Sequence, residues 1–374
     1  MKRYAWFASR SSSFIIDRPV SRWIGLWGLH IVILFLATVA PYPHASIVYL
    51  SHNEYHARHA FFWFQYDVLF YQHIAHHGYH LGQAVFFPFV PALIYLFGRW
   101  GSLIIVQVAY LGILVGLDKW FAQLSFSESE RLRGLVLFAV NPASIFYGTL
   151  YTEPWTMLWA VWSFYAATRS RYGWAAAFAF LGALTHGTGI LIGIMPLVAL
   201  VRAMWLKQKT KMVGALWWGM GTVMGIGVFG AILVHAGLVP WAFVTGQNAW
   251  HAQWIWPWQQ FLKVPPNAIV YGFAVVAASQ VIALGRAMTL TSSSEASLTW
   301  SYKIYVLIGG LVSLSFFVHY SFHSTLRLLS DYFPLYAGAA RLTWRPAFWF
   351  MFLVLWAFSA VGGALWYSHG FWYQ

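Results

Sequence analysis

The 374-residue sequence contains no cysteine and few charged residues. Without cysteine, the chain has no disulfide bond, no thiolate nucleophile and no cysteine metal ligand. Charged side chains make up 8% of the sequence, whereas a soluble domain carries roughly 25%. Such a chain cannot present a water-compatible surface on every side, but its 60% hydrophobic residues can cover it in contact with lipid. The composition therefore excludes an ordinary soluble enzyme and predicts an all-α polytopic membrane protein.

Aromatic residues are abundant, with 24 Trp, 21 Tyr and 31 Phe. Belts of Trp and Tyr at the two membrane interfaces, together with core packing, account for most of them. The others could form flat platforms for the apolar faces of sugars or lipids.

Apolar segments recur along the whole chain, which we interpret as a single membrane domain, residues 1–374, with about 11 spans. The first, Trp23–Ala40, follows a long basic lead without an A-x-A cleavage pattern, so we expect a retained helix rather than a signal peptide. The other predicted spans are roughly 102–120, 134–150, 153–168, 173–186, 188–205, 213–236, 266–288, 302–319, 331–341 and 347–367.

The basic residues are distributed unevenly around these spans. If the N-terminus lies inside, all but four of the 22 Lys and Arg residues fall on the cytoplasmic side. The four on the outer side are Arg58, Arg99, Lys263 and Arg327. The positive-inside rule therefore predicts a cytoplasmic N-terminus, and it explains the net charge of +13 without a nucleic-acid partner.

Two long segments remain on the outer side, residues 41–101 and the Trp-rich residues 237–265. Within the first, Phe86–Phe97 is apolar but too short to span a bilayer comfortably. We expect it to form a re-entrant or half-membrane helix.

The sequence has only nine acidic residues. At the predicted inner edges, beside basic residues, we expect solvated loop charges: Asp17, Asp118, Glu128, Glu130 and Glu295. The outer side keeps the other four: Glu54, Asp67, Glu153 and Asp331. Because an ionisable group at membrane depth is expensive to bury, these outer carboxylates are functional candidates.

Asp67 begins a segment with helical periodicity that extends to Tyr79. At 100° per residue, Asp67, Tyr71, Ile74 and Gly78 share one face of this helix. The carboxylate is therefore expected on the apolar face, directed into protein or substrate rather than into bulk water. A helix cap or a buried partner for arginine would explain the same position.

Histidines cluster around this segment, both on its other stripe and upstream. His73, His77 and His80 lie off the Asp67 face, while His52 and His56 are spaced i,i+4 near His59 and Glu54. That spacing could bind a divalent metal, but it lacks the Glu of a zinc-protease motif. We expect a polar interfacial face, and no metal ion in the reaction.

The Asp67 segment is the first of five blocks of residues that occur in a defined order. The blocks are Asp67-x-x-x-Tyr71-x-x-Ile74-Ala75-x-x-Gly78-Tyr79 with Phe86-Phe87-Pro88; Asn141-Pro142-Ala143-Ser144; Tyr151-Thr152-Glu153; Gln247-x-x-Trp250 with Pro257-Trp258; and Leu326-Arg327 with Asp331-Tyr332-Phe333-Pro334. Together, from about residue 60 to 340, they resemble the PIG-V-like mannosyltransferases. These include the enzyme that adds the second mannose of GPI anchors, with bacterial and archaeal relatives.

The resemblance implies a GT-C glycosyltransferase fold and an inverting reaction on the outer face of the membrane. Such enzymes move a sugar, here mannose, from a polyprenyl-phosphate donor such as dolichyl phosphate mannose to an acceptor hydroxyl. The lipid-linked sugar is a co-substrate, so no cofactor is implied. The implied partners are membrane lipid, the lipid donor and a glycan or glycolipid acceptor.

The reaction assigns roles to the matching residues. An inverting displacement needs a base for the acceptor proton, for which we favour Asp67, and groups that stabilise the leaving phosphate. Donor-phosphate candidates are Arg327, His186 and Tyr332; His186-Gly-Thr-Gly189 stands where the family commonly has Arg-x-x-Gly. Acceptor or sugar candidates are Glu153, Tyr71, Tyr79, Gln247, Trp250 and Trp258.

Two other classes of protein remain open. A secondary transporter would also combine many spans with intramembrane carboxylates, but transporters usually show paired repeats and midplane polar residues in broken helices. Here no repeat is evident, and the acidic residues fall in one outer loop and at outer helix ends. A non-catalytic membrane subunit of a glycan assembly complex predicts that replacing Asp67 is harmless.

Overall fold

The computed structural model describes residues 19–39, 62–259, 268–291, 296–317, 322–343 and 345–368. Within these ranges the regular secondary structure is helical apart from one short antiparallel pair, β1 (Gln253–Trp254) with β2 (Phe316–Phe317). The predicted all-α class is therefore confirmed.

The helices follow one another along the whole chain. In order they are α1 (Pro19–Val39), η2 (Phe62–Phe64), α2 (Asp67–His77), η3 (Leu81–Gln83), α3 (Phe89–Gln123), α4 (Glu128–Ala139), α5 (Ser144–Gly148), α6 (Glu153–Thr168), α7 (Tyr172–Ala183), α8 (Gly187–Ile190), η4 (Leu191–Gly193), α9 (Ile194–Trp205), α10 (Lys209–His235), α11 (Ala242–Thr245), η5 (Gly246–Trp250), α13 (Ala268–Met288), α14 (Ala296–Ser315), α15 (Phe322–Ser330), α16 (Pro334–Leu342) and α17 (Pro346–Ser368).

Six helical segments of the described chain are long and apolar enough to cross a membrane. They are Pro19–Leu36, Phe89–Gln123, Gly187–Trp205, Lys209–His235, Tyr271–Met288 and Pro346–Leu365. Each coincides with a predicted span, and together they fit a polytopic membrane protein. The larger total of about 11 spans stays a prediction.

The predicted span 134–150 is wrong, because two short helices replace it. Helix α4 ends at Ala139 and α5 begins at Ser144. Between them the fully buried Asn141 accepts a hydrogen bond from the N–H of Ala143 (2.9 Å) and donates one to the carbonyl of Phe138 (2.7 Å). Pro142 has no N–H to continue the helical ladder, and the Asn141 side chain closes the turn.

The predicted half-membrane helix Phe86–Phe97 is the first part of α3, which begins at Phe89. The backbone breaks at Gly98 (φ 66°, ψ 171°), a conformation that glycine adopts readily because it has no Cβ. Beyond this break α3 continues to Gln123. How the first part sits in the bilayer stays a prediction.

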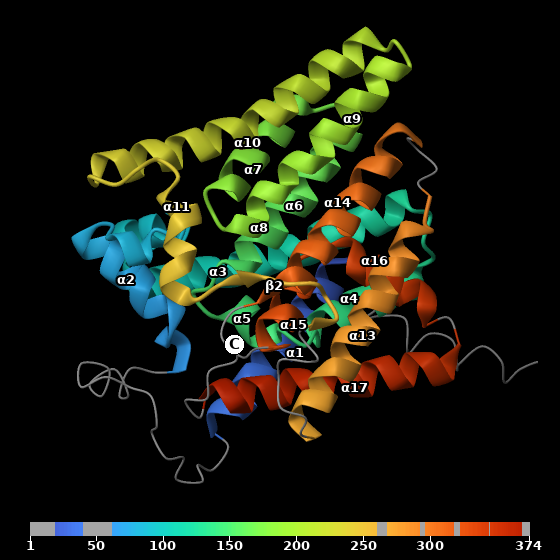
Figure 1. Cartoon of the computed structure of the whole chain (residues 1–374). Helices are drawn as coiled ribbons and strands as arrows, with labels where there is room; N and C mark the ends of the chain where they lie inside the picture. The colour runs from blue at the N-terminus through green and yellow to red at the C-terminus, as the bar shows by residue number, and fades with distance from the viewer. Residues whose placement is uncertain are drawn as a thin grey trace, which may run out of the picture.

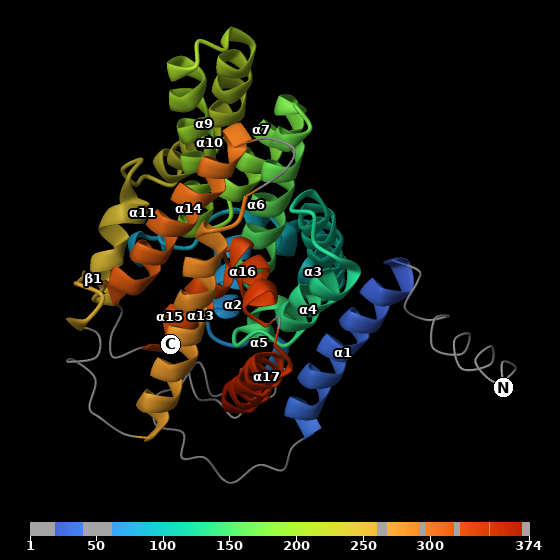
Figure 2. The ribbon, with the colours of Figure 1, turned by 90° about the vertical axis from the view of Figure 1, so that its right-hand side faces the viewer.

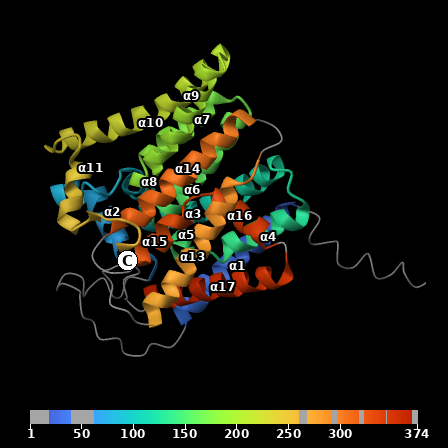
Figure 3. The ribbon, with the colours of Figure 1, turned by 45° about the vertical axis from the view of Figure 1, so that its right-hand side comes forward.

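The long helices pack against one another, and the short helices α2 and α11 of the predicted outer segments lie near each other. Helix α6 contacts both α3 and α7, α10 contacts α7 and α9, and α16 contacts α4 and α13. Figures 1 and 3 show α2 and α11 gathered at one end of α10, and Figure 2 shows α1 and α17 on the side remote from α9 and α10. Close approach needs glycine: a Cβ on Gly338 of α16 would lie 1.8 Å from the Ala283 carbonyl oxygen of α13.

An ion-pair cluster joins α1, α3 and α4 on the predicted inner side. Asp118 is 1% exposed; its Oδ1 lies 2.8 Å from Arg131 Nε and 3.8 Å from Arg22 Nη1. Glu128 pairs with the same two arginines. The expectation of a solvated charge is therefore wrong for Asp118, whose burial is balanced by two guanidinium groups.

The other predicted inner carboxylates differ from Asp118. The side chain of Glu128 is 64% exposed, as expected of a surface charge. Glu130 is largely covered and its Oε1 lies 2.6 Å from Arg341 Nη1. Asp17 and Glu295 lie outside the described residues.

Orientation can be tested directly because the native chain has no cysteine. We expect Ala249→Cys, in the predicted outer segment, to react with a membrane-impermeant maleimide in intact cells. The matched variant Thr210→Cys, at the exposed start of α10, should react only after permeabilisation. The reverse pattern would contradict both the predicted orientation and any reaction on the outer face. Position 53, an alternative outer label, lies outside the described residues.

Candidate functional site

Helix α2 places Asp67 on its buried face, as the periodicity predicts. Asp67, Tyr71 and Ile74 are all buried, whereas His76 and His77 face outward. The buried face packs on α3. The helix begins after Tyr66, an aromatic residue in an unusual backbone conformation (φ 55°, ψ −117°). Strain of this kind concentrates at functional sites.

Arg327 joins two carboxylates that are far apart in the sequence. Its Nη1 lies 3.2 Å from Asp67 Oδ2, and its Nε lies 2.7 Å from Glu153 Oε1. Asp67 begins α2, Glu153 begins α6 and Arg327 lies in α15. The side chains of Arg327 and Asp67 are 12% and 9% exposed, and that of Glu153 is fully buried. The fold therefore brings three predicted site residues into one cluster.

Aromatic rings enclose the Arg327 guanidinium. It lies 5.2 Å from the ring centre of Phe146 and 5.5 Å from that of Tyr151. These cation–π contacts favour the charged guanidinium where water is largely excluded. Tyr71 completes this part of the cluster, with its hydroxyl hydrogen-bonded to Thr152.

The charges of the cluster are unbalanced. Within the described residues, Asp67 and Glu153 contact one cation, Arg327, and the buried carboxyl of Asp331 interacts electrostatically with the same cation. Burial raises the pKa of Asp67 above its ordinary value, and the attraction and hydrogen bond of Arg327 offset part of that rise. A carboxylate with a raised pKa is a stronger base than one in water, provided that it is ionised.

Asp331 holds a second polar group next to Arg327. Its Oδ1 accepts a hydrogen bond from Tyr147 (3.1 Å) and its Oδ2 one from Thr188 (3.4 Å). The Thr188 hydroxyl also lies 2.7 Å from Nδ1 of His186, and its one proton is donated either to Asp331 or to an unprotonated Nδ1. Thr188 thereby connects His186 to the buried Asp331, and His186 also interacts electrostatically with Arg327.

From the sequence, Asp331 is a functional candidate without an assigned role, and neither Tyr147 nor Thr188 is a candidate. A signal for Thr188 existed, because a threonine two residues after His186 can hydrogen-bond back at a helix start, and the backbone N–H of Thr188 does donate to His186 Nδ1 (3.3 Å). No comparable local signal marks Tyr147, whose partners Ser330 and Asp331 lie at the end of α15 and directly after it.

Other predicted site residues lie apart from this cluster. The Tyr332 hydroxyl hydrogen-bonds to Ser313 (3.2 Å), and the residue is fully buried. The Tyr79 hydroxyl donates to the carbonyl of Phe86 (2.9 Å). The indole of Trp250 donates to the carbonyl of Gly82 (2.9 Å). Of these contacts, the one between Trp250 and Gly82 joins the two predicted outer segments.

The remaining two predicted residues lie in the predicted outer segment, after α11. Gln247 is half-buried in η5. Trp258 is 58% exposed and stacks on Trp256, with 5.1 Å between ring centres. The exposed indoles give this segment a flat apolar surface of the kind that sugars and lipids contact.

The histidines of α2 stack rather than converge on a metal. His73 lies 4.6 Å from His77 and 5.7 Å from His80, ring centre to ring centre. No group of three His, Asp or Glu side chains within the described ranges is placed to hold a metal ion. The upstream residues His52, Glu54, His56 and His59 lie outside the described residues, as do Arg58 and Lys263.

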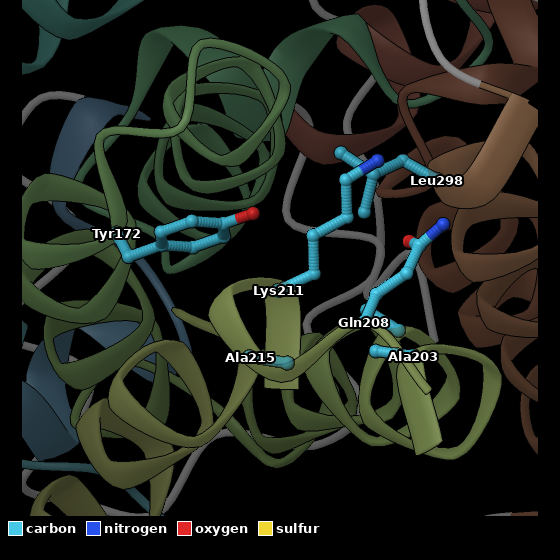
Figure 4. Close-up of a pocket in the computed structure, with 7 residues that line it drawn as sticks. Tyr172, Ala203, Gln208, Lys211, Ala215 and Leu298 are labelled. Carbon is cyan, nitrogen blue, oxygen red and sulfur yellow. The ribbon is translucent and has the colours of Figure 1, made fainter. Parts of the chain in front are cut away.

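A small hollow elsewhere in the molecule is unrelated to this cluster. It has a volume of about 10 Å³, room for about one water molecule, and lies between α7, α9, α10 and α14. Figure 4 shows Tyr172 and Lys211 facing the same space. None of the residues around Arg327 lines it.

The cluster thus combines a basic carboxylate, a cation and a tethered histidine at the meeting point of α2, α5, α6 and α15. Chemically, it can accept a proton and bind an anion. In comparisons with known proteins, no family model and no curated protein matches the chain.

Proposed function

We propose that the chain is a membrane glycosyltransferase that moves a sugar from a polyprenyl-phosphate donor to an acceptor hydroxyl, with inversion, on the non-cytoplasmic face. Mannose is the sugar that the sequence resemblance favours. The observation that carries the proposal is the buried cluster of Asp67, Glu153 and Arg327. Three motifs of that resemblance each contribute one of these residues.

In the proposed reaction, the acceptor oxygen attacks the anomeric carbon and its proton passes to Asp67. The bond from the anomeric carbon to the phosphate oxygen breaks, and the polyprenyl phosphate leaves with the electron pair. The raised pKa of Asp67 suits a general base, because proton transfer is most efficient when the pKa of the base approaches the working pH.

Arg327 is suited to the leaving phosphate. A guanidinium offers five N–H donors in a planar fork, and its contacts with Asp67 and Glu153 involve only Nη1 and Nε. A lipid phosphate that shares Arg327 would weaken its attraction for Asp67. That attraction holds the Asp67 pKa down, so donor binding would make Asp67 more basic.

Glu153 and His186 take supporting roles in this proposal. Glu153 contacts Nε of Arg327 while Asp67 contacts Nη1, and Glu153 could also accept a hydrogen bond from a sugar hydroxyl. In the tautomer whose Nδ1 accepts a hydrogen bond from the backbone N–H of Thr188, His186 carries its proton on Nε2 and could donate a hydrogen bond to the phosphate from there.

The decisive experiment uses the purified full-length protein in lipid vesicles. It is incubated with radiolabelled polyprenyl phosphates that carry mannose, glucose or galactose, with and without a chelator. The proposal expects one sugar to be consumed, with release of polyprenyl phosphate and a labelled glycan or glycolipid. Consumption of none of these donors, with every acceptor fraction tested, would refute it.

The rate of transfer should also depend on pH through Asp67. Because burial raises its pKa, the carboxylate gains a proton at a higher pH than a carboxylate in water does. Only the ionised form can accept the acceptor proton, so kcat/KM should fall as the pH drops through this raised pKa. The pH profile of kcat/KM measures the effect. A profile that stays flat down to the ordinary range of aspartate would contradict the assignment.

A further inference from the structure

A hollow of about 370 Å³ opens where α6 ends and α7 begins. Two arginines, Arg169 and Arg171, line it together with the rings of Trp162, Tyr165, Trp174 and Phe178. Its volume falls within the range of small-molecule sites, roughly 300–1,000 Å³. Figure 2 shows the α6–α7 hairpin and the α9–α10 hairpin at the same end of the molecule, which is the predicted inner side.

The turn between the helices holds both arginines in place. Ser170, between them, has a left-handed backbone (φ 54°). Its N–H bonds to the Ala167 carbonyl, and the N–H of Arg171 bonds to the Ala166 carbonyl, both at 2.9 Å. This pair of bonds is the Schellman arrangement that ends many helices. The arginines are therefore presented from a rigid turn.

The positive charge at this turn is not neutralised within the described part of the chain. Neither Arg169 nor Arg171 forms an ion pair or side-chain hydrogen bond there. Arg22, Arg131 and Arg341, on the same predicted side, each pair with a carboxylate. A pair of exposed guanidinium groups with no acidic partner among the described residues favours an anionic ligand.

The rest of the hollow is aromatic. Trp174 is 63% exposed and stacks on Phe178, with 6.1 Å between ring centres. The indole of Trp162 is fixed to α3 by a hydrogen bond to the Gly112 carbonyl (3.0 Å). An exposed tryptophan at the end of an apolar helix is typical of the membrane–water interface. The hollow thus joins a cationic rim to an apolar wall.

We propose that this hollow binds one anionic phospholipid of the surrounding leaflet. Its phosphate lies between Arg169 and Arg171, and the start of an acyl chain lies along Trp174 and Phe178. Basic hollows between helices on the cytoplasmic side are suited to anionic lipid headgroups, whose leaflet is negatively charged. The site is separate from the Arg327 cluster, so this proposal does not depend on the proposed reaction.

The test uses the purified full-length protein in phosphatidylcholine micelles, titrated with dioleoyl phosphatidylglycerol and followed by native mass spectrometry. The double variant Arg169→Gln/Arg171→Gln should bind the first phosphatidylglycerol about 10- to 30-fold more weakly than the wild type, since each basic residue near an anionic surface contributes about 1 kcal/mol. Trp174→Ala should weaken the same binding through loss of the apolar wall.

The control is Lys207→Gln/Lys209→Gln, which removes equal charge from exposed positions of the α9–α10 turn and should leave the first binding event unchanged. Soluble glycerol phosphate, added as a competitor, should not displace the lipid. Equal weakening of lipid binding in the control would overturn the proposal. Unchanged binding in the arginine variant, or displacement of the lipid by glycerol phosphate, would also overturn it. Both arginines are exposed, so folding of the variants is not in question.

Discussion

Replacing Asp67 by asparagine is expected to reduce sugar transfer roughly 10²- to 10⁴-fold, which is the usual contribution of general-base catalysis. Asparagine has nearly the same size and its amide oxygen can still accept a hydrogen bond from Arg327. It cannot take the acceptor proton. The loss should therefore appear in kcat, measured at saturating donor and acceptor with the purified variant.

Folding should survive this substitution, because Arg327 keeps its contact with Glu153 (2.7 Å). The substitution leaves one carboxylate and one guanidinium in contact, and it removes the desolvation cost of the Asp67 charge. We therefore expect a melting temperature close to that of the wild type. Melting temperature and turnover must be measured on the same preparation.

Asp118→Asn is the matched control for this experiment. Asp118 is also buried and paired with arginine, but it lies in the separate cluster of α1, α3 and α4. The control should lower the melting temperature, because it leaves Arg22 and Arg131 with only the exposed Glu128 as a partner, and it should leave turnover per folded molecule unchanged. A stable Asp67→Asn protein with near-normal turnover would eliminate Asp67 as the base. Glu153 would then be the next candidate, and a non-catalytic subunit would become the stronger interpretation.

The position of Asp67 could be predicted from the sequence because it depends on one helix only. A period of 3.6 residues determines which face of α2 carries the carboxylate, and the structure places Asp67 and Tyr71 on that buried face. The bounds of α6 were predicted for a similar reason. An uninterrupted apolar run specifies a helix without information from elsewhere in the chain.

The ion pairs could not be predicted in this way, because their partners are distant in the sequence. In the sequence Asp118 stands beside Lys119 at a predicted helix end, which suggests a solvated charge. Its observed partners are Arg22 and Arg131. A structural role for Asp67 predicts a pair with Arg58 or Arg327, and the pair with Arg327 is observed, but nothing in the motifs indicates that Arg327 contacts Glu153 as well. Those contacts arise only when α2, α6 and α15 pack together.

The break between α4 and α5 escaped prediction because hydropathy averages over a window. Asn141 is a single polar residue in an apolar run, and its hydrogen bonds to Phe138 and Ala143 satisfy it inside the protein. Composition records only that the segment is apolar. It does not record that a buried amide and a proline together end a helix.

The second large effect is expected for Arg327→Gln, which should destabilise the protein by about 3–5 kcal/mol. This change leaves Asp67 and Glu153 buried without their cation. Loss of Arg327 also removes the group that offsets the raised pKa of Asp67, so that pKa should rise further. A group whose pKa is raised by folding stabilises the fold below its unfolded-state pKa and loses that contribution as the pH rises through the folded-state value.

The destabilisation should therefore shrink at acid pH, where Asp67 is protonated in both states, and grow toward neutral pH. Melting temperature as a function of pH, compared with the wild type, measures it. The matched control is Arg99→Gln, another arginine of the predicted outer side, which lies over Phe64 (5.2 Å to the ring centre) and is exposed. It should change stability little at any pH.

Arg327→Lys separates the structural role of this residue from its role toward the phosphate. Lysine keeps the positive charge between the carboxylates, so it should recover most of the stability that Arg327→Gln loses. It lacks the planar fork that binds a phosphate through two N–H groups, so the KM for the lipid donor should rise although the protein is folded. A folded Arg327→Lys protein with wild-type kcat and KM would show that Arg327 only balances charge, and the phosphate would then have to be bound elsewhere in the site.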